Sequence, residues 1–376
     1  MAPISFARGA PTPACIDEDL IADCARAALA RDGKTILSYG AGGGYGPLRE
    51  LIAAQHAVDP ARVIVTAGGL QGFVFYVAAQ LARRPGRVLV EAPTYDRPLK
   101  LLGWEGVEVV AVPQDDDGLD LEALEAEITR GGDISFLYVI PTFQNPSGRT
   151  LTLERRRRLV ELAVAHGIDV LEDDPYRLVR YEGAPVASLH ELEGGTRVTF
   201  TSSFSKTAAA PGLRVGWFVV PEELRAAVED RASSTYISPS LLPQAIIHEL
   251  FVRSAFETNL ARVNGLLRAQ KDAMLGALER EMPPGVSWSR PDGGYFLWVE
   301  FGPGVDTAEL LRWATEKGVT FVKGADFFPD GAGGTSAARL AFSYESPERI
   351  DEGISMLAAM LEEVPRTVAA GTTQAR

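Results

Sequence analysis

Strand-like runs alternate with helix-like runs through the middle of the chain, and this alternation constrains the fold more than any other feature of the sequence. The strand-like runs are short and rich in apolar and β-branched residues, and they lie at 63–66, 87–91, 107–112, 134–140, 168–172, 197–201 and 215–220. The helix-like runs between them lie at 70–82, 121–129 and 152–165. Strands that alternate with helices form a mostly parallel sheet covered on both faces. The sequence therefore predicts a large α/β domain.

The pattern changes near residue 255, where a long helix-like stretch runs to residue 281 and short strand-like and helix-like runs follow. This change predicts a smaller α+β domain joined by a long helix. The expected divisions are an N-terminal segment that packs with the small domain, a large domain, the small domain and a polar, disordered tail. They lie at 1–34, 35–262, 263–366 and 367–376.

Composition limits the partners of this chain. Of its 376 residues 46% are hydrophobic, which suffices for a sizeable core, and the formal net charge is −13. An acidic balance argues against nucleic acid or an anionic membrane as the main partner. No run of roughly 18 apolar residues predicts a membrane span, and no signal peptide is evident. A cytoplasmic protein is expected. Cys15 and Cys24 are too few for a disulfide framework or a zinc site and are expected to be small apolar residues.

The loop between the last two strand-like runs carries the most distinctive polar residues. Ser203, Ser205, Lys206 and Arg214 lie within twelve residues of one another. Hydroxyls and a guanidinium bind phosphate oxygens well, and a lysine beside such a site can form an imine with an aldehyde. The whole chain has six lysines, so few alternatives exist. An ordinary polar surface loop is the competing interpretation.

Further polar residues follow other strand-like runs directly. Asp173 and Tyr176 follow one run, Asn145 follows another in an Asn-Pro-Ser-Gly turn, and Gly69 and Leu70 join a third to a helix. The carboxyl ends of parallel strands are where open α/β sheets bind ligands, and glycines at a helix start expose N–H groups to anions. Taken one at a time, a helix cap or a turn would explain each of them.

Two other patterns are given simple interpretations. The glycine-rich stretch 40–46 has no preceding strand and no Gly-Lys-Ser/Thr, so it is not a dinucleotide site or a P-loop. The four consecutive arginines at 155–158 are expected to form a solvated face of the helix-like run at 152–165, which Thr152 is expected to cap.

In order and spacing these motifs resemble the fold type I aminotransferases of pyridoxal phosphate. Within class I/II the chain is similar to the branch of aminoadipate and kynurenine aminotransferases. The resemblance extends from residue 6 to residue 342 and is most specific at 203–214, then at 145–148 and 173–176. It implies a mostly parallel sheet of the seven-stranded type with helices on both faces and a smaller α+β domain. It also implies pyridoxal 5'-phosphate as the cofactor.

The resemblance assigns roles around the cofactor ring. It implies that Lys206 carries the imine and shuttles the proton, and that Asp173 pairs with the pyridine nitrogen and keeps it protonated. Asn145 and Tyr176 are expected to hydrogen-bond the phenolic oxygen, and Tyr95 to stack on the ring. Lys206, Asp173 and Tyr176 are thus the expected catalytic residues.

The resemblance also assigns phosphate and carboxylate contacts. The expected phosphate ligands are the backbone N–H groups of Gly69 and Leu70 and the side chains of Ser203, Ser205 and Arg214. Tyr39 is expected to reach the phosphate of a partner subunit, which implies a homodimer with shared active sites. Arg339 is expected to bind the substrate α-carboxylate, with Asn145 beside it. Members of this branch often carry a hydroxyl residue and a glutamine at the positions of Gly69 and Leu70. One side-chain contact to the phosphate is therefore expected to be missing in this chain.

The activity expected from these residues is the transfer of an amino group from an L-amino acid to a 2-oxo acid. Two alternatives stay open. Decarboxylation, elimination or oxidation of an amino acid would use the same cofactor residues, which serve the ring and not the reaction. A ligand-sensing domain of a transcription regulator is the second alternative, and the acidic charge argues against it.

Substrate selection is expected to rest on two kinds of residue. Phe6, Tyr45 and Tyr295 are expected to form an apolar wall, and Arg8 to bind a second carboxylate, such as that of glutamate. Arg8 stands where close relatives often carry a glycine. The expected substrates are therefore glutamate or 2-oxoglutarate on one side and an apolar or aromatic amino acid on the other.

Overall fold

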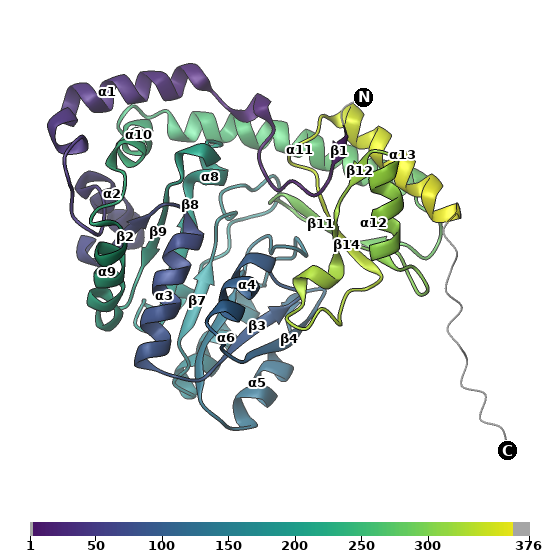
Figure 1. Cartoon of the computed structure of the whole chain (residues 1–376), viewed down its shortest axis with the longest axis horizontal. Coiled ribbons are helices and arrows are strands. Elements are labelled where there is room, and N and C mark those ends of the chain that lie inside the picture. The colour runs from purple at the N-terminus through teal and green to yellow at the C-terminus, as the bar shows by residue number, and fades with distance from the viewer. Residues whose placement is uncertain (1–2, 364–376) are drawn as a thin grey trace.

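The computed structural model describes residues 3–363, and its main feature is a large sheet (Figure 1). Its strand order is β2-β9-β8-β7-β6-β3-β4-β5. These strands are β2 (Val63–Thr66), β3 (Arg87–Ala92), β4 (Val109–Asp115), β5 (Gly118–Leu119), β6 (Ile134–Val139), β7 (Val170–Asp173), β8 (Val198–Ser203) and β9 (Gly216–Val219). Among them β9 and β5 run against the others. The predicted mostly parallel α/β sheet is confirmed, and the additional strand is the two-residue β5, which is too short to give a sequence pattern.

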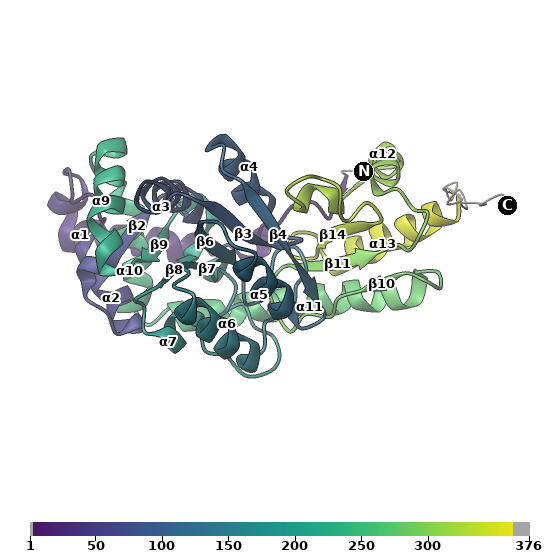
Figure 2. The ribbon, with the colours of Figure 1, turned by 90° about the horizontal axis from the view of Figure 1, so that it is seen from below.

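Helices cover both faces of this sheet (Figure 2). One face carries α3 (Gly69–Arg83), α4 (Asp96–Trp104) and α9 (Glu222–Tyr236), and the other carries α2 (Gly46–His56), α5 (Leu121–Thr129), α6 (Leu153–Ala165) and α7 (Leu189–Glu193). An outer layer of α1 (Glu18–Ile36) and α10 (Leu241–Val252) lies over α2. Alternate residues of β3 supply both cores, because Val88 and Val90 point to one face and Leu89 to the other.

The start of α6 shows one predicted cap and one wrong interpretation. Thr152 caps the helix, since its side chain accepts a hydrogen bond from the Arg155 N–H, as the sequence predicts. The solvated face expected for the arginine run is wrong for Arg156, which is completely buried. Its guanidinium donates to the carbonyl oxygens of Pro141, Leu151 and Ala187 at 2.7–3.0 Å. Arg156 therefore holds the loop that follows β6.

The C-terminal part of the chain builds a second, antiparallel sheet of order β10-β11-β14-β13. The long helix α11 (Phe256–Glu281) leads into it, as the sequence indicates. The remaining elements are β10 (Ser287–Trp288), β11 (Phe296–Glu300), α12 (Thr307–Glu316), β12 (Val319–Thr320), β13 (Val322–Lys323), the short helix η4 (Gly324–Phe327), β14 (Ala337–Ala341) and α13 (Pro347–Glu363). Between residues 3 and 363 no helix is long and apolar enough to cross a membrane.

The N-terminal residues divide between the two halves. Strand β1 (Ile4–Ser5) pairs in parallel with β12, and Phe6 is buried in the core around the smaller sheet. Beyond the short helix η1 (Pro13–Cys15), α1 packs against α10 of the larger half. The predicted domain boundaries remain predictions. Within the 1–34 segment, β1 pairs with the smaller half, whereas α1 packs against the larger half. The predicted tail at 367–376 lies outside the described residues.

Candidate active site

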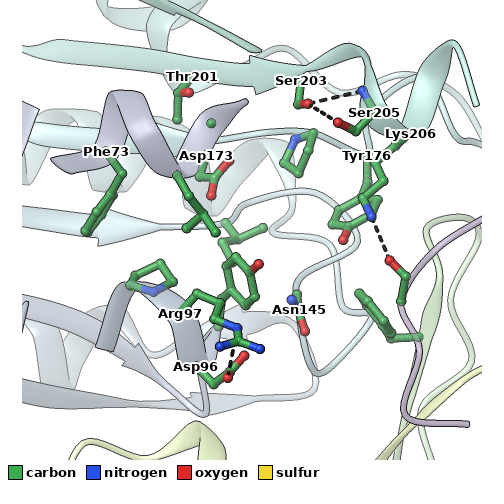
Figure 3. A pocket seen from close by; sticks show the side chains of 18 of the residues that line it. Phe73, Asp96, Arg97, Asn145, Asp173, Tyr176, Thr201, Ser203, Ser205 and Lys206 are labelled. Atoms are coloured by element: carbon green, nitrogen blue, oxygen red, sulfur yellow. Dashed lines mark hydrogen bonds and ion pairs between the residues drawn. The ribbon is translucent and has the colours of Figure 1, made fainter. Parts of the chain in front are cut away.

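A cavity of about 500 Å³ lies between the carboxyl ends of the large-sheet strands and the smaller sheet (Figure 3). Its wall combines the start of α3, the start of α4, the ends of β7 and β8, the N-terminal segment and the smaller sheet. The polar and aromatic residues that line it are Phe73, Tyr95, Asp96, Arg97, Asn145, Asp173, Tyr176, Thr201, Ser202, Ser203, Ser205, Lys206, Arg214, Phe296 and Arg339. Most residues that the sequence singles out are thus gathered at one site.

Lys206 projects into this cavity from α8 (Phe204–Thr207). Its Nζ donates a hydrogen bond to the carbonyl oxygen of Gly9 at 2.7 Å and lies 4.9 Å from the centre of the Tyr295 ring. Burial, followed by the positive charges of Arg339 and Arg214, lowers the pKa of Lys206 to about 8. A substantial fraction of the amine is therefore neutral near pH 8 and can act as a nucleophile.

Next to Lys206, hydroxyl and guanidinium groups form an anion site. Ser203 Oγ lies 2.9 Å from Ser205 Oγ, and Arg214 Nη1 donates to Ser205 Oγ at 3.3 Å. Arg214 follows the short helix η3 (Pro211–Leu213) and adopts φ 53°. Gly69 and Leu70 begin α3 on the opposite side of this corner, where no side chain caps the helix. Free N–H groups, two hydroxyls and a guanidinium together suit a phosphate.

This corner closes because glycine occupies position 216. A Cβ atom there would lie 2.5 Å from the Gly69 N atom and 2.7 Å from the Gly68 carbonyl carbon, so β9 could not approach the start of α3. Gly68 itself has φ +84°, a conformation that favours glycine. The two glycines let the helix start and Arg214 lie side by side.

Asp173 lines the cavity from the last position of β7. Its Oδ2 accepts a hydrogen bond from the Tyr138 hydroxyl at 2.8 Å. Burial raises the pKa of Asp173 to about 7, against the opposing effect of that hydrogen bond. No cationic side chain within 3–363 makes an ion pair with this carboxylate. A positively charged ligand atom in the cavity would therefore favour its ionised form.

The aromatic side chains give the cavity a slot for a flat ring. Tyr95 precedes α4 and lines the cavity, and burial raises its pKa to about 12. Tyr176 is buried, packs 5.4 Å from the Tyr295 ring, and has a pKa raised by burial. Asn145 enters from the turn after β6. All three residues line the cavity, and their contacts with a bound ring remain predictions.

Arg339, on β14, brings the smaller sheet to the cavity. It is buried, and its guanidinium donates to Asn145 Oδ1 at 3.0 Å and to the Ala7 carbonyl oxygen at 2.8 Å. The guanidinium also lies 4.2 Å from the centre of the Phe296 ring. These partners are neutral, so the positive charge has no carboxylate partner among the described residues. A buried guanidinium without a carboxylate partner suits a ligand carboxylate, and this role of Arg339 remains a prediction.

Two predicted site residues lie outside the cavity wall. Arg8 is exposed and lies over Tyr344, with Cζ 4.4 Å from the ring centre and Nη1 donating to the hydroxyl at 2.9 Å. Tyr39 is 84% exposed on the surface. A role for either residue needs a movement of Arg8 or a second subunit, and both roles remain predictions.

The apolar wall expected from Phe6, Tyr45 and Tyr295 is wrong. Phe6 is buried among core residues of the smaller half, and Tyr45 is buried among those of the larger half. Tyr295 is also buried, and its ring centre lies 4.9 Å from Lys206 Nζ. Their side chains fill cores, and none of the three lines the cavity. The apolar lining comes instead from Leu70, Phe73, Ile140, Phe296 and Val322.

Sequence reasoning missed several residues of the site. Tyr138 lies inside a strand, so its polar contact to Asp173 carried no separate signal. Phe73 lies four residues after Gly69 in α3, so it shares a helix face with Gly69 and could have been predicted from that spacing. Arg97 lines the cavity two residues after Tyr95, which the sequence already singled out.

Comparison with known proteins identifies the family to which this chain belongs. The family model described as aminotransferase class I and II matches residues 12–357. A 2-aminoadipate transaminase of Thermus thermophilus is 36% identical over 363 residues, which cover 96% of this chain and 90% of that protein. An aromatic-amino-acid aminotransferase of Thermococcus litoralis is 32% identical and covers 96% of this chain and 88% of that protein.

Solved structures agree. The α-aminoadipate aminotransferase of Thermus thermophilus, complexed with N-(5'-phosphopyridoxyl)-L-leucine, is 35% identical, with a TM-score of 0.89 over 96% of this chain and 92% of that one. The Pyrococcus horikoshii kynurenine aminotransferase is 32% identical, with a TM-score of 0.90 over 96% and 91%. The resemblance seen in the motifs is confirmed, and the alternative reactions and the regulator are not favoured. The chain belongs to the class I and II aminotransferases and is an enzyme that transfers amino groups with pyridoxal phosphate.

Proposed function

We propose that this aminotransferase exchanges an amino group between glutamate or 2-oxoglutarate and an apolar or aromatic amino acid. The observation that carries the proposal is the buried Arg339 guanidinium, which faces the cavity beside apolar side chains and has only neutral partners. A substrate with an α-carboxylate supplies the missing negative charge, and its side chain meets Phe73 or Phe296. The named relatives act on aminoadipate, aromatic amino acids and kynurenine, which include both acidic and aromatic side chains.

The residues of the cavity fit the cofactor. Bound there, the pyridoxal ring supplies an aldehyde carbon that takes the amino group and an electron-withdrawing system that stabilises negative charge next to it. Arg214, Ser203 and Ser205 would hold the phosphate, together with the N–H groups at the start of α3. Asp173, whose pKa is raised by burial, gains a cationic partner if it holds a proton on the ring nitrogen. Tyr95 and Tyr176 would hold the ring in place.

Lys206 then performs the proton transfer. Its Nζ faces the cavity and lies close to both Tyr176 and Tyr295, and its lowered pKa leaves the amine ready to accept a proton. A base with a pKa near the working pH is efficient in both directions of a proton transfer. In this assignment Lys206 moves the proton at the substrate α-carbon, while Arg339 and Asn145 keep that carbon oriented.

A donor and acceptor screen on the purified holoenzyme tests the proposed substrates. Each amino acid is mixed with the enzyme, and formation of pyridoxamine phosphate is followed by absorbance. We expect glutamate and at least one apolar or aromatic amino acid to convert the cofactor, and 2-oxoglutarate to reverse the conversion. Release of carbon dioxide, ammonia or hydrogen peroxide without pyridoxamine phosphate would instead indicate decarboxylation, elimination or oxidation.

We also propose that two copies of this chain form the working enzyme. Tyr39 lies in a loop that exposes apolar surface, with Leu37 75% exposed and Ile237 65% exposed. The hydroxyl of Tyr236, next to Ile237, donates to the Gly42 carbonyl oxygen, so the two exposed segments lie together. A second subunit would cover this surface and bring Tyr39 to the phosphate of its neighbour. A location in the cytoplasm also remains a prediction.

The dimer is tested by mixing two variants. Tyr39→Phe should weaken cofactor retention by roughly ten- to hundredfold, the usual effect of one charge-assisted hydrogen bond. In a hybrid of Tyr39→Phe with Lys206→Ala, the site that keeps Lys206 receives an intact tyrosine from its partner. The hybrid should therefore retain the cofactor at that site as tightly as the wild type. Sedimentation gives the subunit number, and a fully active monomer would contradict the proposal.

A further inference from the structure

Arg97 is the third arginine that lines the cavity, besides Arg214 and Arg339. It is the second residue of α4, two positions after Tyr95, and it lines the same cavity as Arg339. Figure 3 shows its guanidinium next to Asp96, on the side of the cavity where Asn145 lies. The side chain is 59% exposed, so it stands at the mouth of the cavity.

The hydrogen-bond donors of Arg97 are available. Its Nε lies 3.6 Å from Asp96 Oδ2, which is an ion pair at a distance too long for a hydrogen bond. Within residues 3–363 its guanidinium makes no hydrogen bond to another residue. Asp96 has a second cationic partner, since Lys100 Nζ lies 3.3 Å from the same oxygen. Arg97 can therefore turn toward a ligand without leaving Asp96 unpaired.

The two arginines act on each other through the cavity. Burial is the main cause of the lowered pKa of Arg339, and the charge of Arg97 contributes in the same direction. Two positive charges that face one cavity repel each other, and a ligand with two carboxylates relieves that repulsion. A monocarboxylate held by Arg339 would leave Arg97 in water.

Arg8 is the alternative for this role, and its surroundings differ. Its guanidinium is stacked over Tyr344 and donates to the hydroxyl of that residue, and it does not line the cavity. Binding a ligand through Arg8 would break both contacts. Arg97 would lose only its 3.6 Å ion pair with Asp96.

We propose that Arg97 binds the second carboxylate of dicarboxylic substrates and so determines acidic specificity in this enzyme. This assignment rests on the part of the proposed function that concerns glutamate or 2-oxoglutarate, and it does not depend on the identity of the apolar or aromatic substrate. It requires the first carboxylate at Arg339 and leaves apolar substrates independent of Arg97. The partly exposed position means that Arg97 can swing into solvent when a side chain without charge enters.

The test uses unreactive acids that bind to the holoenzyme without turnover. Glutarate has two carboxylates, and pentanoate has the same number of carbons and one. Their dissociation constants are measured by calorimetry for the wild type, Arg97→Met, Arg97→Lys and Arg8→Met. The ratio of the two constants cancels general effects of a variant on the cavity.

We expect the wild type to bind glutarate more tightly than pentanoate, and Arg97→Met to lose roughly ten- to hundredfold of that preference, the effect of one charge-assisted hydrogen bond. Arg97→Lys should restore part of it, and Arg8→Met should keep it. KM for glutamate should rise in Arg97→Met with little change in kcat.

Three results would overturn the assignment. Arg97→Met could retain the full preference, Arg8→Met could lose it in place of Arg97→Met, or the wild type could show none. Amino transfer from an apolar amino acid, measured on the same samples, separates these results from a failure of the proposed function. Transfer that persists without a glutarate preference would refute the role of Arg97 alone.

Discussion

Replacement of Lys206 by alanine is expected to abolish the covalent attachment of the cofactor and to lower turnover by on the order of 10⁴-fold, the upper end of what a positioned acid–base group supplies. The reason is that Lys206 is the amine at the cavity wall whose pKa burial lowers to about 8. Alanine removes both the nucleophile and the proton carrier. The phosphate corner is untouched, so the variant should still bind the cofactor without a covalent bond.

Borohydride reduction followed by peptide mapping measures this directly. In the wild type the label should lie on Lys206, and in Lys206→Ala no peptide should be labelled. Lys317→Ala is a matched control, because Lys317 is an exposed lysine directly after α12 that pairs with Glu363. That variant should keep the label and the activity. A label on any other lysine would show that the nucleophile has been misassigned.

Asp173→Asn is expected to have the second-largest effect, a fall in kcat of on the order of a hundredfold or more. A buried carboxylate beside a ring nitrogen stabilises a proton there, and this matters most when negative charge develops on the ring. Asparagine keeps the size and the contact to Tyr138 but supplies no charge. Cofactor binding should therefore change far less than turnover.

Asp174→Asn is the control for this variant. Asp174 is fully buried, whereas Asp173 is partly exposed to the cavity. The Oδ2 atom of Asp174 accepts a hydrogen bond from Thr142 Oγ1 at 3.2 Å, and Asp174 does not line the cavity. Steady-state rates and the absorbance of the bound cofactor should distinguish the two. If Asp174→Asn lost turnover and Asp173→Asn kept it, the neighbouring acid would be the partner of the ring.

The elements around the site could be predicted because their patterns are local. Strands buried on both faces have continuous apolar runs, as in β3 and β6, and each run ends where a polar motif begins. Site residues at or just after such strand ends, such as Asp173 at the end of β7 and Lys206 after β8, could therefore be predicted together. Thr152 was predicted as a cap for the same reason, since a cap depends on residues a few positions away.

What the sequence did not reveal depends on distant parts of the chain. Arg156 is buried because carbonyl groups from two loops converge on it, and a run of arginines carries no sign of that. Phe6 and Tyr45 are aromatic residues of the kind that line apolar substrate pockets. In the structure, however, Phe6 is buried in the core of the smaller half and Tyr45 in the core of the larger half. Arg97 shows no helical or strand periodicity that would set it apart from other surface arginines.

The contacts of the N-terminal segment have a consequence for the evolution and engineering of this enzyme. The segment meets the active site through backbone carbonyl groups, with Ala7 O on Arg339, Gly9 O on Lys206 and Ala10 O on Ser343. Such contacts depend on the length of the segment and not on its side chains, although position 9 must stay glycine because a Cβ atom there would lie 2.6 Å from the Phe296 ring. One inserted or deleted residue would move every carbonyl by a position and leave both cations facing the wrong atoms. The spacing between β1 and this segment is therefore more constrained than the amino acids that fill it.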